Sequence, residues 1–301
     1  MGSFRTSIGG QAVMEGISMR GPEVTCLAVR KPDGSILKET IPTRINKYDK
    51  IPIIRGIAAF IISLETGYKQ LMRSSEIAFP DEEEDKFDQW IKKHFGENNK
   101  VINYLVAVLA GFLSVGLFMF LPTILCSVMS TLFPFLIGFR TVLESILKLC
   151  IFIGYIFLAS RMPDVKRVFQ YHGAEHKTIF CYENEEELTV NNVKKYGRFH
   201  PRCGTSFMFI TLLISIVIFS FVPWDSTIKR VLYKLIALPI IMGISYEIIK
   251  YCGKHDNTLS KALSFPGLLI QRLTVFEPDE KMIEVAISSI SEVIPSNQDK
   301  V

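Results

Sequence analysis

Long uncharged stretches alternate with polar segments along this chain of 301 residues. No Asp, Glu, Lys or Arg occurs from Val101 to Phe139, and none occurs from Ser206 to Trp224. A helix needs about 20 apolar residues to cross a hydrocarbon core of about 30 Å, and uncharged runs of this length favour spanning helices over buried core helices. The pattern therefore predicts a polytopic α-helical membrane protein with about four transmembrane helices.

Interruptions in these stretches place the individual helices. The four transmembrane helices are expected at residues 101–122, 140–159, 206–222 and 231–249. The second of them carries Arg140, Glu144 and Lys148, which recur every fourth residue and so lie on one helical face. A charged stripe is costly against lipid. We therefore expect this face to point toward protein or to lie near an interface.

The first 50 residues have the pattern of a small soluble region. Two runs of strand-forming side chains, Val24–Arg30 and Ser35–Ile41, flank the turn sequence KPDG, which predicts a β-hairpin. The glycine-rich stretch before them, Gly9–Gly16, indicates constrained loops. It matches neither of the glycine fingerprints of nucleotide-binding loops.

The remaining segments are shorter. The apolar stretch in residues 51–72 is interrupted by Arg55 and is short for a span, so it predicts an interfacial or re-entrant helix. An acidic run at 81–85 predicts a solvated linker, and Lys281–Val293 has an amphipathic pattern. The chain thus divides into a soluble region (1–50), an interfacial or re-entrant helix with an acidic linker (51–100), two transmembrane helices (101–160), a polar segment (161–205), two more transmembrane helices (206–250) and a C-terminal tail (251–301).

Basic residues indicate the orientation, because cytoplasmic loops carry an excess of Lys and Arg. The 122–139 connection has no basic residue, whereas the polar segment 161–205 has eight. The pattern predicts a multi-pass protein whose two termini and 161–205 segment share the cytoplasmic side. The expected partner is the lipid bilayer, together with a protein partner or a second copy of the chain. No interleaving of aromatic and basic residues indicates nucleic acid.

The polar segment contains the residues that point to chemistry. His172 and His176 stand four apart, so on a helix their side chains lie on one face and could bind one ion. With Glu175 they form the pattern His-x-x-Glu-His, the inverted zinc-protease motif in which the glutamate is the general base. The spacing therefore predicts a helical metal-binding segment with Glu175 as the catalytic base.

A second pair of candidate ligands follows in the same segment. His200 and Cys203 have a compact chelating spacing, with Pro and Gly that suit a tight ligand loop. Together with the two earlier histidines, they could supply four zinc ligands of the nitrogen and sulfur kind, although the identity of the metal stays open. The alternative is a set of separate surface histidines and a small buried cysteine.

The number of ligands separates a structural from a catalytic metal. Four protein ligands close a tetrahedral site, whereas three leave a position for water. If Cys203 is free, the three histidines leave that position open and Glu175 could polarise the water. Glu247, near the cytoplasmic end of the fourth helix, is a further candidate ligand or a snorkelling interfacial charge.

Other charges are weaker candidates. Glu15 and Arg20 could line the same cytoplasmic site, with a surface salt bridge as the alternative. The acidic cluster Glu183–Glu187 is expected to cap a loop that is exposed to water.

Several long motifs resemble the YqhQ family of bacterial membrane proteins, and they are spread over nearly the whole chain. These motifs are GGQAVMEG (9–16), MRGP (19–22), PIIRG (52–56), YHGAEHKT (171–178), RFHPRCGTSF (198–207), GISYE (243–247), PGLLIQRLT (266–274) and EPD (277–279). The resemblance implies a multi-pass protein of the bacterial cytoplasmic (inner) membrane. The family has been described as metal-dependent enzymes, which implies a metal at the same histidines.

Two classes of function follow. The first is a cytoplasm-facing metal-binding protein that acts as a zinc-dependent hydrolase with Glu175 as base. The second is a non-enzymatic membrane scaffold, transporter subunit or membrane-protein assembly factor, in which the metal only pins the 161–205 segment. An open metal position beside Glu175 favours the enzyme, and a closed site with Glu175 turned away favours the scaffold. A channel or carrier is a weaker third option, because four helices with few intramembrane charges offer little pathway.

Overall fold

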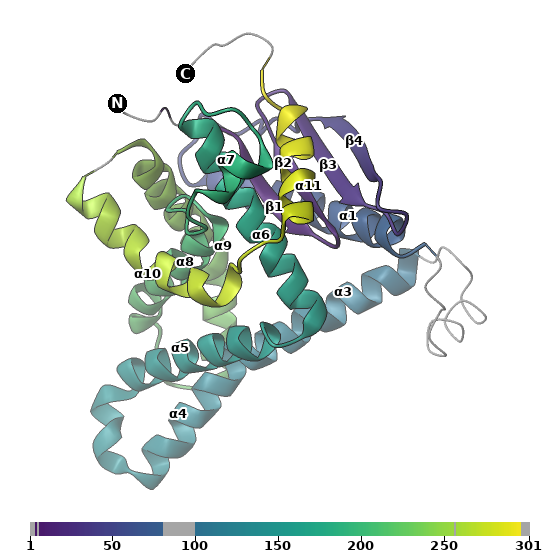
Figure 1. The fold of residues 1–301 in the computed structure, drawn as a ribbon. Coiled ribbons are helices and arrows are strands. Elements are labelled where there is room, and N and C mark those ends of the chain that lie inside the picture. Colours follow the sequence, from purple (N-terminus) through teal and green to yellow (C-terminus); the bar gives the residue numbers. More distant parts are fainter. Residues whose placement is uncertain (1–3, 5, 81–99, 256, 296–301) are drawn as a thin grey trace. The chain divides into compact units, whose positions relative to one another are not determined.

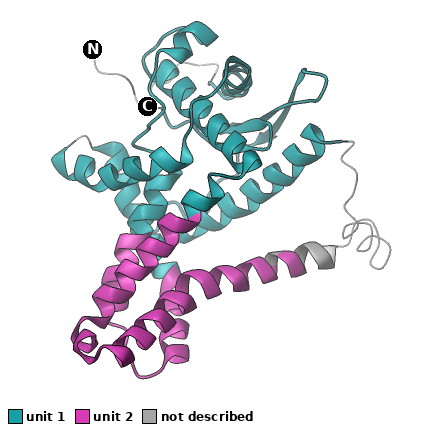
Figure 2. Cartoon of the chain, turned by 60° about the horizontal axis from the view of Figure 1, so that its bottom comes forward, with its two compact units in different colours: residues 1–80, 156–211, 239–301 teal, residues 81–155, 212–238 magenta. Residues whose placement is uncertain are grey.

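The computed structural model describes residues 4, 6–80, 100–255 and 257–295, so the acidic run at 81–85 lies outside the described residues. The described chain is mostly helical and carries an N-terminal four-stranded antiparallel sheet (Figure 1). It divides into two compact units (Figure 2). Unit 1 comprises Met1–Pro80, Ile156–Thr211 and Pro239–Val301, and unit 2 comprises Asp81–Tyr155 and Leu212–Leu238.

The sheet has the strand order β1-β2-β3-β4. Its strands are β1 (Gly9–Val13), β2 (Gly16–Arg20), β3 (Val24–Arg30) and β4 (Ile36–Pro42). The last two strands form the hairpin that the sequence predicts, and their pairing runs from Val24 opposite Pro42 to Arg30 opposite Ile36. The turn between them contains Gly34 at φ 86°, a backbone conformation that favours glycine.

The prediction of loops at Gly9–Gly16 is wrong, because this stretch forms β1, a turn and the start of β2. Its glycines permit close packing. A Cβ on Gly10 would lie 2.9 Å from the carboxyl carbon of Glu175, and a Cβ on Gly16 would lie 2.5 Å from the carbonyl oxygen of Ala28. The glycines therefore let neighbouring groups approach the strand backbone, a use of glycine that sequence alone does not separate from loop flexibility.

The sheet is covered on both faces. One face packs against α6 (Pro163–Glu183) and α11 (Glu280–Ser291), and the other packs against the C-terminal end of α1 (Ile54–Ala78). The first face contributes Ile17, Met19, Cys26 and Ala28, and the second contributes Val13, Leu27 and Val29. This alternation is the period of two that places successive side chains on opposite faces of a strand.

Helix α11 confirms the amphipathic pattern read at Lys281–Val293. Its apolar side chains Met282, Ile283, Val285 and Ile290 are buried in the same core as the first sheet face. Asp279 caps the helix, because its carboxylate accepts the backbone N–H of Met282 at 2.8 Å. The cap and the apolar stripe together fix this helix over the sheet.

Within the described residues, three helical stretches are long and apolar enough to cross a membrane, and a fourth apolar helix is shorter. The three are Val108–Leu132, Pro134–Ala159 and Thr227–Lys254. The last two correspond to η2 (Pro134–Phe139) with α5 (Arg140–Ala159) and to α9 (Thr227–Lys254), while the shorter apolar helix is α8 (Gly204–Ser220). The four expected transmembrane helices are thus present as helices, three of them with the length of a span.

The first of these helices runs further than the sequence suggested. Its end was expected at Pro122, but α3 (Lys100–Val115), the π-helical turn η1 (Gly116–Phe120) and α4 (Leu121–Leu132) form one continuous helical path. The backbone N–H of Leu121 bonds to the carbonyl of Gly116, five residues earlier. This wider turn directly precedes Pro122 and accommodates a residue that would otherwise break an α-helix.

Helix α1 occupies most of the segment 51–72, where the sequence predicts an interfacial or re-entrant helix, and its relation to the membrane stays a prediction. It is not among the three stretches that are long and apolar enough to cross a membrane in the described chain. Large apolar side chains nevertheless remain exposed along one side of it: Ile54, Ile61, Leu64, Tyr68 and Met72. An exposed apolar stripe along one side of a helix is the pattern expected of a helix that lies in a membrane interface.

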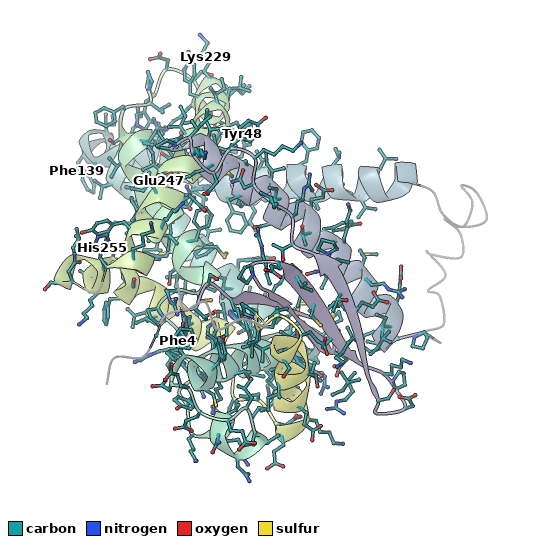
Figure 3. The ribbon with its side chains drawn as sticks, turned by 90° about the horizontal axis from the view of Figure 1, so that it is seen from above. Phe4, Tyr48, Phe139, Lys229, Glu247 and His255 are labelled. Carbon is teal, nitrogen blue, oxygen red and sulfur yellow. The ribbon has the colours of Figure 1, made fainter. Side chains whose placement is uncertain are left out.

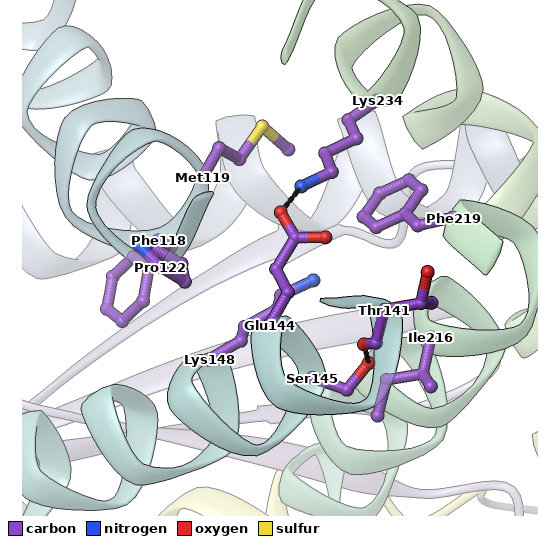
Figure 4. Close-up of a pocket in the computed structure, with 10 residues that line it drawn as sticks. All are labelled: Phe118, Met119, Pro122, Thr141, Glu144, Ser145, Lys148, Ile216, Phe219 and Lys234. Carbon is purple, nitrogen blue, oxygen red and sulfur yellow. Dashed lines mark hydrogen bonds and ion pairs between the residues drawn. The ribbon is translucent and has the colours of Figure 1, made fainter. Parts of the chain in front are cut away.

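The charged stripe of α5 faces protein within unit 2, as expected. Glu144 accepts hydrogen bonds from Arg230 at 2.7 Å and from Thr123, and it pairs with Lys234 (Figure 4). Arg230 is 0% exposed, Lys234 3% and Glu144 5%. We call Thr123, Glu144, Arg230 and Lys234 the ion cluster. It borders a cavity of about 10 Å³, which is the size of one water molecule.

Candidate metal centre

Helix α6 places the two histidines of the inverted motif side by side. It begins at Pro163, whose fixed φ suits the first helical turn, and it continues to Glu183. His172 and His176 therefore lie one turn apart on one face, with ring centroids 4.4 Å from each other. His176 is 2% exposed.

The third member of the site comes from the segment before α8. Cys203 is 8% exposed, and its sulfur lies 3.1 Å from Nε2 of His172. The backbone N–H of Cys203 donates to the carbonyl of His200 at 3.3 Å, and the hydroxyl of Thr205 donates to the sulfur at 3.4 Å. The tight turn expected around Pro201 and Gly204 thus presents the sulfur to helix α6.

Backbone carbonyls determine which nitrogen of each histidine is available. Nδ1 of His172 lies 3.0 Å from the carbonyl oxygen of Thr274, at the end of α10 (Thr258–Thr274), and Nδ1 of His176 lies 2.6 Å from that of Arg198. A carbonyl oxygen can only accept, so both Nδ1 atoms carry the proton and both Nε2 atoms keep a lone pair. Histidines that bind metals typically have this second hydrogen bond.

The ligand atoms of His172, His176 and Cys203 all lie within 4.8 Å of one another, and we call these three residues the metal group. Zinc–nitrogen bonds of about 2.0–2.1 Å and zinc–sulfur bonds of about 2.3 Å would separate tetrahedral ligand atoms by roughly 3.3–3.8 Å. Small side-chain rotations therefore suffice to close the group around one ion. The group could hold a metal, and its donor set of two nitrogens and one sulfur does not fix which metal.

The electrostatics of the site agree with neutral imidazole ligands. Burial lowers the pKa of His176, because the charged imidazolium is poorly solvated there. A neutral ring keeps the lone pair that a metal requires. Metal binding at His176 would therefore need no displacement of a proton near neutral pH.

His200 lies near this group, but its ring is held by other partners. The ring centroids of His176 and His200 are 5.6 Å apart. Nδ1 of His200 accepts the backbone N–H of Arg202 at 3.3 Å, and Nε2 faces the carboxylate of Glu183 at 3.7 Å. The side chain of Gln271 also bonds both the N–H and the carbonyl of His200. His200 would reach a metal only after one of its ring nitrogens lost its present partner.

Glu183 is a buried member of the site that the sequence reading placed on an exposed loop, and that reading is wrong for this residue. It is 5% exposed, whereas its neighbours in the acidic cluster are exposed. Burial disfavours its charge, but hydrogen bonds from His200 and Arg202, and one from the N–H of Thr6, outweigh burial and lower its pKa. Its position at the end of α6 was the available signal, because that face also carries the histidines.

Glu175 lies on α6 but is packed against the sheet. It is 5% exposed, and its carboxylate contacts the backbone of Gly10 in β1, from which it accepts a hydrogen bond. Burial raises the pKa of this carboxyl group. The structure therefore places the expected base on the helix that carries His172 and His176, buried, with its carboxylate hydrogen-bonded to β1.

The remaining charged candidates lie elsewhere in unit 1. Glu247 lies on α9 (Figure 3). It pairs with Arg55 of α1 and also accepts the N–H of Ile53 at 3.1 Å. Glu15 pairs with Arg167. These two carboxylates thus have cationic partners of their own and are not members of the metal group.

Sequence reasoning missed the groups that orient the ligands. The carbonyls of Arg198 and Thr274 and the amide of Gln271 fix the rings and the loop, yet a backbone carbonyl leaves no trace in residue type. Gln271 belongs to the motif PGLLIQRLT, so its signal was a polar residue inside an apolar helix. It is 0% exposed.

Comparison with known proteins agrees with the motifs. A family model described as "Protein of unknown function (DUF1385)" matches residues 51–296. The chain is 38% identical over 292 residues to "Uncharacterized protein YqhQ" of Bacillus subtilis (strain 168), which covers 95% of this chain and 92% of that protein. No solved structure matches. The chain is a YqhQ-like protein and belongs to the DUF1385 family.

Proposed function

We propose that this protein is a metal-binding protein of the bacterial cytoplasmic membrane whose metal is zinc. The observation that carries the proposal is the convergence of the two Nε2 lone pairs and the Cys203 sulfur within 4.8 Å. Nitrogen and sulfur donors in this number are typical of zinc. Lone pairs that face one another in a buried site are unfavourable unless a cation or a proton lies between them.

The ligand count supports a zinc-dependent hydrolase as the first candidate. Three protein ligands leave one position open, and His200, the fourth ligand expected from the sequence, would close it only by leaving Arg202 and Glu183. When bound, a zinc ion with an open position supplies Lewis acidity and activates water. Glu175 would take up the proton, and burial raises its pKa, which makes the carboxylate a stronger base.

The second candidate is a non-enzymatic scaffold, transporter subunit or assembly factor. It is favoured by the packing of Glu175 against Gly10, which ties helix α6 to the edge strand of the sheet. In this function the metal would hold α6 to the 198–203 loop, and Glu175 would have only a structural role. The same three ligands serve both candidates, so the glutamate decides between them.

The deciding experiment is Glu175→Gln in a deletion strain, with zinc content measured on the purified protein. Glutamine keeps the size of the side chain but cannot act as a base. The hydrolase predicts retained zinc and a rate about 10²–10⁴-fold lower, and therefore failed complementation. Full complementation with zinc retained would leave the scaffold. Glu76→Gln, an exposed carboxylate on α1, is the matched control and should complement fully.

We further propose that both termini and residues 161–205 lie in the cytoplasm. Eight basic residues in that segment, against none between residues 122 and 139, support this orientation. Single cysteines introduced at Lys195 and at Phe133, which lies between α4 and η2, provide the test with a membrane-impermeant thiol reagent, in a background without the native cysteines. Labelling of position 195 from outside intact cells would overturn the orientation.

A further inference from the structure

Unit 1 contains a second hollow that the metal centre does not use. It is a groove of about 950 Å³ between the sheet and helix α1, within the size range of small-molecule sites. The sheet side is lined by Gln11, Ser18 and Thr25, and the helix side by residues that include Thr66 and Gln70. Hydroxyl and amide groups thus line both walls.

The groove opens where the packing between sheet and helix changes from apolar to polar. Val13 and Leu27, on the same sheet face, close onto Ile77 and Ala78 of α1. Toward the other end of the helix, Gln11 donates from Nε2 to the carbonyl of Gly67 at 3.4 Å. At this end, helix and sheet are therefore joined by a polar contact, whereas at the other end they are joined by apolar packing.

The groove carries a surplus of positive charge. Among the described residues that line it, Arg20, Arg44 and Lys69 are cationic, and Glu65 is the one carboxylate. Glu65 pairs with both Arg44 and Lys69, while Arg20 donates to the carbonyl of Arg44 at 3.1 Å. An anionic group would therefore be attracted to the groove, and guanidinium groups match the geometry of phosphate oxygens.

A buried amide at the groove lacks a partner. Gln70 is 7% exposed, and its Nε2 atom has no hydrogen-bond acceptor among the described residues. A buried donor without an acceptor is unfavourable, and such groups are uncommon in folded proteins. Gln70 also lines the groove, so a rotation of its side chain would bring Nε2 to an acceptor oxygen bound there.

One edge of the groove is kept open by glycine. Gly9 lines the groove, lies on the same face of β1 as Gln11, and has no atom within 4 Å of the position that a Cβ would occupy. Gly9 and Gln11 belong to the motif GGQAVMEG, and Arg20 belongs to MRGP. These two motifs therefore supply an open edge, an amide and a cation of one hollow.

From these observations we propose that the groove binds a phosphate ester with hydroxyl groups, such as a glycerol phosphate head group. The exposed apolar stripe of α1, with Ile61, Leu64 and Tyr68, lies on the same helix as the lining residues Glu65 and Lys69. A helix that rests on a bilayer by this stripe would bring the groove to the level of lipid phosphates. The chemistry is shared by an anionic lipid and by a soluble phosphate ester.

The test uses the full chain in a neutral detergent with three probes: short-chain phosphatidylglycerol, short-chain phosphatidylcholine and glycerol 3-phosphate. Binding is measured by native mass spectrometry and by calorimetry. We expect phosphatidylglycerol to bind and phosphatidylcholine to bind at least tenfold more weakly. Binding of glycerol 3-phosphate as well would identify a soluble ester as sufficient, and its failure to bind would identify the lipid as the source.

Variants locate the binding in the groove. Gly9→Leu should abolish binding by filling the open edge, and Arg20→Gln should weaken it by about tenfold or more through loss of a charge-assisted hydrogen bond. Arg73→Gln is the matched control, because Arg73 is an exposed cation on α1 outside the groove, and it should bind like the wild type. Arg20 is itself exposed, so its replacement keeps the test valid if Gly9→Leu does not fold. Absence of binding by both anionic probes, or equal binding by Arg20→Gln and Arg73→Gln, would overturn the proposal.

Discussion

The ion cluster of unit 2 and the metal group of unit 1 are both largely buried sets of polar side chains, but only the ion cluster contains cations paired with a carboxylate. In the ion cluster, each cation faces Glu144, and Thr123 fills a further hydrogen-bonding position. In the metal group, two imidazole lone pairs and a sulfur face each other. The first set contains the counter-charges for its own charges, whereas the second is a set of donor atoms that could hold a metal.

Buried polar groups that have partners within the protein serve the structure, whereas buried donor atoms without such partners point to binding. A buried polar group is tolerated when a partner satisfies it, and it indicates a binding site when nothing in the protein does. Glu183 provides an intermediate case inside unit 1. It is as buried as Glu144, and it is paired with Arg202 and faces His200.

The largest effect is expected from breaking the ion cluster. Glu144→Gln leaves Arg230 and Lys234 buried without a counter-charge, and removal of one partner from a buried ion pair costs about 3–5 kcal/mol. Thermal or denaturant unfolding of the detergent-solubilised protein measures this loss. Glu76→Gln, which breaks an exposed ion pair on α1, should change stability by less than about 1 kcal/mol. Equal stability of the two variants would show that the ion cluster is not a closed structural set.

The next largest effect is expected at the metal group. Removal of a ligand there should lower the metal content of the protein rather than prevent it from folding. His172→Ala and His176→Ala each remove one of three donors. Changes around a metal site typically cost 10–100-fold in affinity even outside the ligands, so loss of a ligand should cost at least as much. Elemental analysis of purified protein should find zinc in the wild type and none in either variant.

The matched control for these variants is His255→Ala, since this histidine is exposed and stacks on Tyr251 outside the group. Its zinc content should equal that of the wild type. A chelator should lower the melting temperature of the wild type and of the control but not that of His176→Ala, because only metal-loaded protein gains stability from binding. Zinc near one per chain in both ligand variants would refute the assignment.

The sequence was sufficient for those parts of both clusters that depend on local spacing. The i, i+4 pair His172 and His176 predicted a shared helical face, and the four-residue spacing of Arg140, Glu144 and Lys148 predicted a stripe that faces protein. Helix existence was likewise predicted for each apolar stretch, because length and lack of charge are local properties.

Partners that are distant in the chain were not predictable from spacing. Arg230 meets Glu144 across 86 residues, and Thr274 meets His172 across 102. The sequence offered His200 as a ligand on the same grounds as Cys203, and only the fold shows that Arg202 and Glu183 engage its ring. The strands β1 and β2 were missed because their glycines serve close contacts with Glu175 and Ala28.

The smallest of these effects is expected at Glu183, the paired carboxylate of unit 1. Its pKa is lowered in the folded protein, since hydrogen bonds from His200 and Arg202 favour the ionised form over the opposing effect of burial. A lowered folded pKa contributes stability above the unfolded pKa of about 4.3, and this contribution is lost as the pH falls through the folded pKa.

Glu183→Gln should therefore lose about 1–3 kcal/mol at pH 7, as expected for hydrogen bonds to a charged group. Denaturant unfolding at several pH values should show this difference shrinking below about pH 4. Glu187→Gln, in the same acidic cluster but exposed, should match the wild type within about 0.5 kcal/mol. A Glu183→Gln deficit that stays constant down to pH 3 would mean that packing, rather than the carboxylate charge, holds the 198–203 loop against α6.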